Sequence, residues 1–231
     1  MSPETQFPAT AVVTGAAGGI GSALVRRLEA EGTRVRRLDL VDGFDVSDPD
    51  AWEAVEPADL VALNAGVLAA GDGSVEDYRR ILSVNVDGVV LGVRALAPRM
   101  RPGSTFVVTA SLAGLIPMPN DPLYSLTKHA VVGYARSVAP ELAARGVRIN
   151  LVAPGIVRSP MTAPVQAELE AAGFPLMEPE QIVEAVLVAA RSRETGQAWV
   201  CQPGREPLPF RFPNVPGPRV EGAEGMVPPL R

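Results

Sequence analysis

Tyr124 and Lys128 are the two residues whose types and spacing could most directly do chemistry. Residues four apart on a helix project from one face, so a phenol and an ammonium can reach the same small site. A phenol has an unperturbed pKa of about 10, and a nearby cation favours the phenolate. Lowering that pKa by about three units requires about 4 kcal/mol, which one close charge can supply. An amphipathic surface pair has the same spacing, so the pair alone is a weak signal.

A glycine-rich segment about a hundred residues earlier strengthens the signal: Thr14-Gly15-Ala16-Ala17-Gly18-Gly19-Ile20-Gly21. It follows the apolar run 9–13, suited to a buried strand, and precedes apolar residues with helical spacing over 22–30. Such a turn presents backbone N–H groups and a positive helix end to a phosphate. Gly15 permits the sharp turn, Gly19 the approach of a diphosphate, and Gly21 close packing of helix on strand. The alternative is a flexible turn without a ligand.

Composition limits the class of protein. The chain has 231 residues, 47% of them hydrophobic and 20% charged, which is the size of one globular domain. A net charge of −5 and the lack of any basic run argue against a nucleic-acid partner. The single Cys201 excludes an internal disulfide, and no apolar stretch reaches about twenty residues unbroken. We therefore expect no membrane span, and because residues 1–8 do not form a signal peptide, we expect a cytoplasmic location.

The order of these motifs resembles the short-chain dehydrogenase/reductase family, in its compact single-domain branch. The wide Thr-Gly-x3-Gly-x-Gly spacing is that family's form of the dinucleotide fingerprint. Further matching motifs follow in order over about residues 8–201: Asp45-Val46, Asn64-Ala65-Gly66, Asn85-Val86-Asp87-Gly88, Ser111-Leu112-Ala113-Gly114, Tyr124-x3-Lys128, Arg148-Ile149-Asn150 and Pro154-Gly155. The resemblance implies an oxidoreductase that interconverts a secondary alcohol and a ketone with a nicotinamide dinucleotide.

The alternation of apolar runs with helical patterns predicts an α/β fold, a single-domain doubly wound parallel sheet of Rossmann type. The domain should cover residues 1–202, with a substrate lid at about 158–178, and residues 203–231 should form an extended proline-rich tail. Strands are predicted near 9–14, 34–39, 58–63, 104–110, 147–152 and 197–201. Helices are predicted near 19–30, 48–55, 75–100, 123–145 and 178–191, with a kink or break at Pro140.

One departure from the family pattern lies between Asp39 and Asp45. Only five residues intervene, whereas a parallel crossover needs about a dozen or more. The crossover helix between the second and third strands should therefore be missing. Either Phe44-Asp45-Val46 is a short strand beside the second strand, which we favour, or the third strand is absent.

Asp39 decides the predicted cofactor. A carboxylate at the end of the second strand can accept hydrogen bonds from ribose hydroxyls and would repel a 2′-phosphate, so NAD is expected. Arg36 or Arg37 could instead pair with that phosphate and favour NADP, although Arg37 should lie on the face of Asp39 and neutralise it. Asp39 could also be an ordinary turn residue.

Other cofactor contacts follow from the resemblance. Asp45 and Val46 should flank the adenine, and Asn64, Ala65 and Gly66 should line the floor near the ribose. For Asn64 a structural bond to strand backbone is equally compatible with the sequence. Around the nicotinamide the resemblance places Pro154, Gly155, Val157 and Ser159, with the Ser159 hydroxyl reaching the carboxamide. Gly18 and Ile20 belong to the diphosphate turn.

The catalytic roles are also those that the resemblance implies. Tyr124 is the proton donor and acceptor, and Lys128 stabilises the phenolate and holds the nicotinamide ribose. Ser111 supports the substrate oxygen, and Asn85 ties a water relay to Lys128. The alternatives are a loop hydroxyl for Ser111 and a buried amide that bonds backbone for Asn85.

The sequence gives weaker signals for metal binding, for the substrate and for a function without catalysis. His129, the single histidine, is turned about 100° from the catalytic face and should pack. With one histidine and one cysteine, no metal site of ordinary ligand type is expected. The lid is apolar, which suits either a hydrophobic alcohol or ketone or packing on the body. A dinucleotide-binding sensor or scaffold without catalysis is the alternative to the enzyme.

Assembly is expected from the two long helices. Their apolar residues exceed what one sheet contact would use, so we expect a homodimer or a tetramer with two-fold symmetry. The residues on which this expectation rests are Val86, Val89, Val90, Val93, Leu96, Val131, Val132, Tyr134, Val138 and Leu142.

Overall fold

The computed structural model describes residues 7–214, 217–222 and 226. Within them the chain forms a seven-stranded sheet in the order β2-β1-β3-β4-β5-β6-β7, parallel except for β7. The strands are β1 (Thr10–Thr14), β2 (Arg34–Leu38), β3 (Leu60–Leu63), β4 (Thr105–Thr109), β5 (Arg148–Pro154), β6 (Ala198–Cys201) and β7 (Leu208–Pro209). The predicted doubly wound sheet is confirmed.

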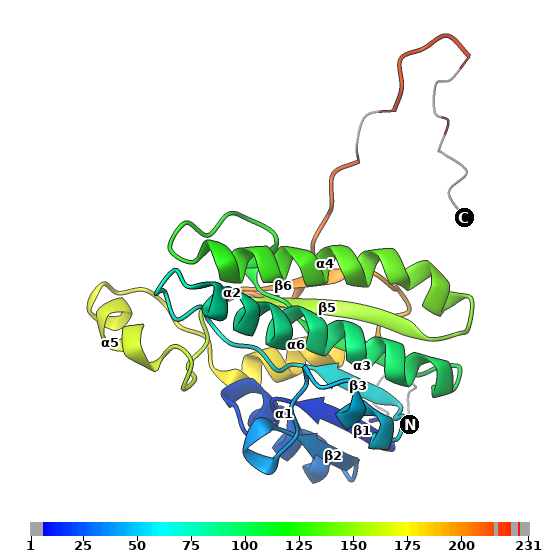
Figure 1. Ribbon diagram of the computed structural model, residues 1–231, viewed down its shortest axis with the longest axis horizontal. Helices are drawn as coiled ribbons and strands as arrows, with labels where there is room; N and C mark the ends of the chain where they lie inside the picture. The colour runs from blue at the N-terminus through cyan, green and yellow to red at the C-terminus, as the bar shows by residue number, and fades with distance from the viewer. Residues whose placement is uncertain (1–6, 215–216, 223–225, 227–231) are drawn as a thin grey trace.

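Helices cover both faces of the sheet (Figure 1). They are α1 (Gly19–Ala30), α2 (Val75–Leu82), α3 (Gly88–Leu96), α4 (Pro122–Ala143), α5 (Ala163–Ala171) and α6 (Pro179–Arg191). One hydrophobic cluster lies between the sheet and α1 with α6, and a second between the sheet and α3 with α4. The short helix α5, which the sequence patterns did not predict, projects beyond the sheet.

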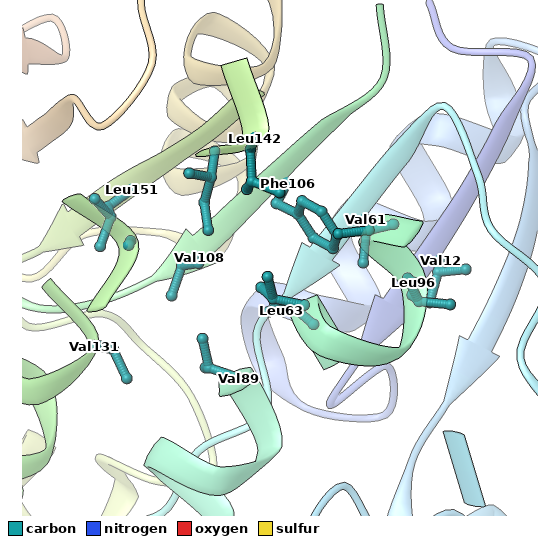
Figure 2. Packing of buried hydrophobic residues seen from close by; sticks show 14 of the residues in the cluster. Val12, Val61, Leu63, Val89, Leu96, Phe106, Val108, Val131, Leu142 and Leu151 are labelled. Carbon is teal, nitrogen blue, oxygen red and sulfur yellow. The ribbon is translucent and has the colours of Figure 1, made fainter. Parts of the chain in front are cut away.

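The central strands are apolar on both faces because both faces are covered. All four residues of β3 are buried, as are the first four of β4. Figure 2 shows Leu63 and Phe106 of the sheet facing Val89 and Leu96 of α3, in the cluster that also takes in Leu142 of α4. This packing fixes the strand ends at which the site is built.

The helix predicted at 75–100 is interrupted by a π-helical turn at Ser83–Asp87. The helical stretch Val75–Arg99 is long and apolar enough to cross a membrane by length and composition alone. Its apolar residues Val89, Val93 and Leu96 are buried against the sheet, which accounts for the composition.

Most of the apolar residues on which the expected assembly rests are buried inside one chain. Six of the ten residues are buried within the subunit, so this part of the expectation is wrong: Val89, Val93, Leu96, Val131, Val132 and Leu142. The other four are partly exposed: Val86, Val90, Tyr134 and Val138. Sequence periodicity could not separate the two sets, because the helices bury a wider stripe than a two-residue seam.

The connection from β2 to β3 contains two 3₁₀ helices, Leu40–Asp42 and Asp50–Ala54, the second replacing the helix predicted at 48–55. Phe44, Asp45 and Val46 form no strand, so the short strand we favoured is wrong and β2 is the edge of the sheet. The chain turns at Gly43, with a φ of 82°, before it could run beside β2. Trp52 then closes the core, with its indole N–H donating to the Val46 carbonyl at 2.9 Å.

The tail begins as part of the sheet. β7 pairs with β6, and the Phe210 N–H donates to the Ala198 carbonyl at 2.8 Å. The Arg136 guanidinium of α4 lies 3.6 Å from the centre of the Phe212 ring, and Phe210 also packs on the core, so both phenylalanines anchor the start of the tail on the body. Beyond them the described residues run away from the body (Figure 1). Pro140 lies within α4, which continues to Ala143, so no break occurs there.

Candidate active site

The glycine turn joins β1 to α1 and has no room for side chains. Gly15 has a φ of +64°, and a Cβ there would lie 2.9 Å from the Ala65 Cα. A Cβ on Gly21 would lie 2.0 Å from the Gly15 carbonyl oxygen, and one on Gly19 would lie 2.8 Å from the Ser159 Cβ. Each of these distances is shorter than a van der Waals contact. Glycine is therefore needed at 15 for the turn, at 21 for the contact of α1 with that turn, and at 19 for the contact with Ser159.

The start of α1 suits an anion. The first N–H groups of a helix have no partner inside it, and no side chain caps them at Gly18. No acidic residue lies in the first turn. Gly18 itself donates to the Gly15 carbonyl at 3.1 Å, and Ile20 packs into the cluster beneath. A dinucleotide diphosphate fits this helix end in charge and in hydrogen bonding.

Asp39 follows β2 and faces the glycine turn. Its Oδ2 accepts the Ala17 N–H at 2.8 Å and its Oδ1 accepts the Val41 N–H at 3.2 Å. The carboxylate oxygens retain lone pairs that can accept ribose hydroxyls. Arg37 pairs with Glu29 of α1 at 2.6 Å, so the expectation that Arg37 neutralises Asp39 is wrong. Strand alternation places Arg36 on the opposite face from Arg37.

Asp45 and Val46 make local contacts. Asp45 accepts the Ser47 N–H at 2.8 Å and the Ser47 hydroxyl at 2.7 Å. Val46 is buried, and a Cβ on Gly88 would lie 2.7 Å from its Cγ2. Their predicted place beside the adenine stays a prediction.

Asn64 ties strand ends together. Its Nδ2 donates to the carbonyls of Thr14 and Gly15 at 3.2 and 3.4 Å, and its Oδ1 accepts the Thr109 hydroxyl at 3.1 Å. These bonds give Asn64 the structural role that the sequence left open. The Ala65 N–H donates to the Thr14 hydroxyl at 3.0 Å, which fixes the loop at the end of β3.

Lys128 and Tyr124 lie together on α4. Lys128 is 4% exposed, its Nζ donates to the Thr109 carbonyl at 2.8 Å, and it lies 5.4 Å from the centre of the Tyr124 ring. Burial lowers the pKa of Lys128 to about 8. Gly66 borders the ammonium, since a Cβ there would lie 3.4 Å from Nζ. The site therefore holds a poorly solvated ammonium whose hydrogen bond goes to a backbone carbonyl and not to a carboxylate.

Tyr124 is partly buried, and burial raises its pKa to about 12. The Ser111 hydroxyl lowers this pKa, and the charge of Asp121 raises it. The lowered pKa expected from the Lys128 charge is therefore not found. The ammonium lies over the ring and donates to the Thr109 carbonyl, and burial of the phenol is the largest cause of its raised pKa.

Ser111 follows β4 and caps the 3₁₀ helix Leu112–Gly114. Its Oγ accepts the Ala113 N–H at 3.1 Å, which leaves the hydroxyl proton free to be donated. The structure thus brings together Ser111, Tyr124 and Lys128, as predicted from the sequence.

Asn85 lies in the π-helical turn and is 1% exposed. Its Nδ2 donates to the Val67 carbonyl at 2.9 Å and to the Thr127 hydroxyl at 3.0 Å, and its Oδ1 accepts the Val67 N–H at 2.8 Å. Thr127 in turn donates to the Tyr124 carbonyl at 2.8 Å. The side chain therefore fulfils the backbone-bonding alternative, and the water relay stays a prediction.

The segment after β5 crosses the glycine turn. β5 ends at Pro154, and the Gly155 N–H donates to the Cys201 carbonyl at 2.9 Å. Val157 forms a parallel bridge with Met177, and Ser159 packs on Gly19, with its N–H donating to the Thr162 hydroxyl at 3.2 Å. The four residues predicted near the nicotinamide thus run from a strand end to the diphosphate turn.

The predicted lid is held by ion pairs of Arg158, and its helix α5 has no buried residue. Arg158 pairs with Glu170 and, at 2.8 Å, with Glu178. Met177 is buried, whereas Met161 and Phe174 are exposed. Met177 therefore packs on the body, whereas contact of Met161 and Phe174 with a hydrophobic substrate stays a prediction.

Two residues of the site escaped the sequence patterns. Asp121 caps α4, which the Asp-Pro pair at 121–122 could have indicated, since Pro is favoured in the first turn. Thr109 contributes its backbone carbonyl, which no residue type reveals.

His129 is exposed and bonds to the Ser125 carbonyl, so the expectation that it packs is wrong. Among the described residues no group of His, Cys, Asp and Glu could hold a metal ion.

Fold and site together define a Rossmann-type parallel sheet with a helix end suited to a nucleotide diphosphate. The family model described as Enoyl-(Acyl carrier protein) reductase matches residues 44–196. An uncharacterized short-chain type dehydrogenase/reductase of Sinorhizobium fredii is 34% identical over 94% of this chain and 47% of its own length. The chain thus spans about half of that relative. It belongs to the short-chain dehydrogenase/reductase family.

Two further proteins are similar over most of their own length. A 3-alpha-(or 20-beta)-hydroxysteroid dehydrogenase of Mycobacterium tuberculosis is 31% identical, over 84% of this chain and 88% of that protein. The crystal structure of a protein described as an NAD(P) dependent gluconate 5-dehydrogenase from Beutenbergia cavernae, with bound NADP, has a TM-score of 0.76 and 29% identity. The structural match covers 86% of this chain and 97% of the Beutenbergia cavernae protein.

Proposed function

We propose that the chain is an NAD-dependent enzyme that interconverts an apolar secondary alcohol and its ketone. The observation that carries the proposal is the convergence of Ser111, Tyr124 and the buried Lys128. They meet where β4 and α4 approach the glycine turn, beside a helix end suited to a diphosphate. A scaffold without catalysis has no chemical need for a buried ammonium beside a phenol.

The three side chains divide the work on the substrate oxygen. The helix end at Gly18 and the Asp39 carboxylate would hold the dinucleotide, whose nicotinamide would supply a hydride acceptor for oxidation and a hydride donor for reduction. Tyr124 takes the hydroxyl proton in the first direction and donates it in the second. Ser111 donates a hydrogen bond to the same oxygen and stabilises its developing charge. Lys128 places a positive charge beside the phenol and favours its ionised form.

The raised pKa of Tyr124 affects ketone reduction and alcohol oxidation differently. The phenol of Tyr124 has its pKa raised to about 12 by burial, so it holds its proton at neutral pH and can give it to a ketone. Alcohol oxidation needs the phenolate and should therefore accelerate as the pH rises. Ligands that bring a positive charge beside the ring would lower this pKa and widen the working range.

NAD is preferred over NADP in this proposal because of the Asp39 carboxylate. It lies against the glycine turn, where a 2′-phosphate would meet its negative charge. Arg37, which could have bound that phosphate, is held by Glu29. The bound NADP of the Beutenbergia cavernae protein concerns that protein, so the choice here rests on Asp39.

The proposed substrate is apolar because the open side of the site is apolar. Large hydrophobic side chains are exposed after the Ser111 turn and on the lid: Ile116, Met118, Met161, Val165 and Phe174. A hydrophobic ligand would bury them. The similarity to a hydroxysteroid dehydrogenase points in the same direction.

We also propose a homodimer or a tetramer with two-fold symmetry. Its support is now narrower, because only Val86, Val90, Tyr134 and Val138 of the predicted set keep exposed surface on α3, α4 and the π-helical turn between α2 and α3. Sedimentation at micromolar protein that gives a mass of one chain, 24.2 kDa, would contradict it.

A substrate screen tests the catalytic proposal. Diverse secondary alcohols are incubated with the protein and either NAD or NADP, and the absorbance of the reduced cofactor is recorded. We expect turnover with apolar alcohols and NAD, and none in the Tyr124→Phe variant. Binding of NAD without turnover of any alcohol or ketone would favour a sensor or scaffold.

A further inference from the structure

Asp121 uses both carboxylate oxygens at the start of α4. Its Oδ1 accepts the Tyr124 N–H at 2.8 Å and caps the helix. Its Oδ2 accepts the Ala69 N–H at 3.2 Å. Ala69 lies in the loop after β3, three residues beyond Gly66, which borders the Lys128 ammonium. One carboxylate therefore joins the helix turn that carries the phenol to the loop beside the ammonium.

The first turn of α4 is held on a second side as well. The Ser125 hydroxyl donates to the Ala113 carbonyl at 2.9 Å, which ties the turn to the 3₁₀ helix after Ser111. Without Asp121 the turn would keep this attachment and lose the one to the Ala69 loop. Loss of Asp121 should thus displace Tyr124 relative to Lys128 and Gly66 while the fold persists.

Asp121 also acts on the phenol by its charge, which disfavours the phenolate. The other ionised group beside the ring is Lys128, one turn along α4. Ser111 and Asn85 are neutral, and residues 67–70 carry no ionisable side chain. The elements packed on α4 carry Glu76, Arg79 and the Asp77–Arg80 ion pair on α2, Asp87 in the π-helical turn and Arg148 on β5.

We propose that Asp121 is a positioning residue of the alcohol–ketone reaction: its two carboxylate oxygens hold the Tyr124 turn against the Ala69 loop. The inference rests on the proposed function. The charge of the same carboxylate adds to the burial that keeps the phenol protonated.

Two variants separate the two effects. Asp121→Asn can still cap the helix through its amide oxygen but loses the charge. Asp121→Glu keeps the charge but moves the oxygens by one methylene. Glu141→Gln is the charge control, because Glu141 is an exposed carboxylate near the far end of the same helix. Ser74→Ala is the cap control, because Ser74 caps α2.

Activity is measured as kcat and kcat/KM for alcohol oxidation across pH. Asp121→Asn should move the rising limb of the profile to lower pH and lower the maximal kcat by about tenfold through misplacement. Asp121→Glu should lower kcat and leave the limb in place. The two controls should match the wild type in both respects. A wild-type kcat in both Asp121→Asn and Asp121→Glu would overturn the proposal.

A readout without turnover keeps this test separate from the proposed function. The chain has three tyrosines, so ¹³C-labelled tyrosine gives three NMR signals, and Tyr124→Phe identifies the one to follow. Its titration should move to lower pH in Asp121→Asn and stay in place in Glu141→Gln. An unmoved titration would overturn the role of Asp121. A normal shift in a protein that oxidises no alcohol would instead count against the proposed function.

Discussion

Replacing Asp39 by Asn should change cofactor preference more than any other single substitution. Asn keeps an oxygen that can accept the Ala17 or the Val41 N–H, so the glycine turn should stay in place. It loses the negative charge. Hydrogen bonds to a charged acceptor contribute about 1 kcal/mol more than bonds to a neutral one, so two ribose hydroxyls should lose about 2 kcal/mol. NAD should then bind about 30-fold more weakly.

NADP should gain from the same change. A unit charge about 4 Å from another at the protein surface contributes about 1–4 kcal/mol, and the low end suits a partly exposed carboxylate such as Asp39. Removal of this repulsion should tighten NADP by about fivefold or more. The ratio of the two affinities should therefore move by about 10²- to 10³-fold toward NADP.

Equilibrium titration of wild type and variant with NADH and NADPH, followed by cofactor fluorescence, measures this ratio. Asp42→Asn is the matched control, because it removes an exposed carboxylate three residues further along and should leave the ratio unchanged. A wild type that already prefers NADP, or an Asp39→Asn variant with an unchanged ratio, would refute the reasoning.

Four further substitutions test other parts of the account. Tyr124→Phe should leave NAD affinity nearly unchanged and lower turnover by at least about 10²-fold in steady-state assays, because proton transfer is lost; turnover within a few-fold of wild type would count against it. Gly21→Ala should abolish NAD binding in a titration, since its Cβ would lie 2.0 Å from the Gly15 carbonyl oxygen, and normal affinity would show that the turn can move. Lys128→Met should remove a rise in the free energy of unfolding between about pH 8 and pH 10.5, because there the unfolded lysine holds a proton that the folded one has lost; urea titrations at both ends measure it, and an equal rise in both proteins contradicts the lowered pKa. Trp52→Ala should lower the free energy of unfolding by about 3–5 kcal/mol through the cavity and the lost bond to Val46, and a loss below about 1 kcal/mol in thermal unfolding would mean that the site collapses.

The sequence predicted the elements whose pattern is local. The buried strands and the helices α1, α4 and α6 follow from apolar periodicity, and the glycine turn follows from spacing between strand and helix. The meeting of Ser111, Tyr124 and Lys128 followed from the order of motifs in a family, since no local pattern brings Ser111 from β4 to α4.

Other features depend on contacts that no local pattern encodes. The 3₁₀ turns after β2 are fixed by Trp52 and Val46, and they replaced the short strand that we favoured. The pKa of Tyr124 depends on burial, on the Ser111 hydroxyl and on the charge of Asp121, which only the folded chain brings together. Which apolar residues of α3 and α4 remain exposed is likewise decided by the width of the packed face.

The most direct test of the proposed function is the transfer of deuterium. A secondary alcohol labelled at the carbinol carbon is incubated with the protein and NAD, and the reduced cofactor is analysed by mass spectrometry. The wild type should give NADH that carries the deuterium, and Tyr124→Phe should give at least about 10²-fold less of it in the same time. NADH free of deuterium, or no NADH from any secondary alcohol by a protein that binds NAD, would contradict the proposed function.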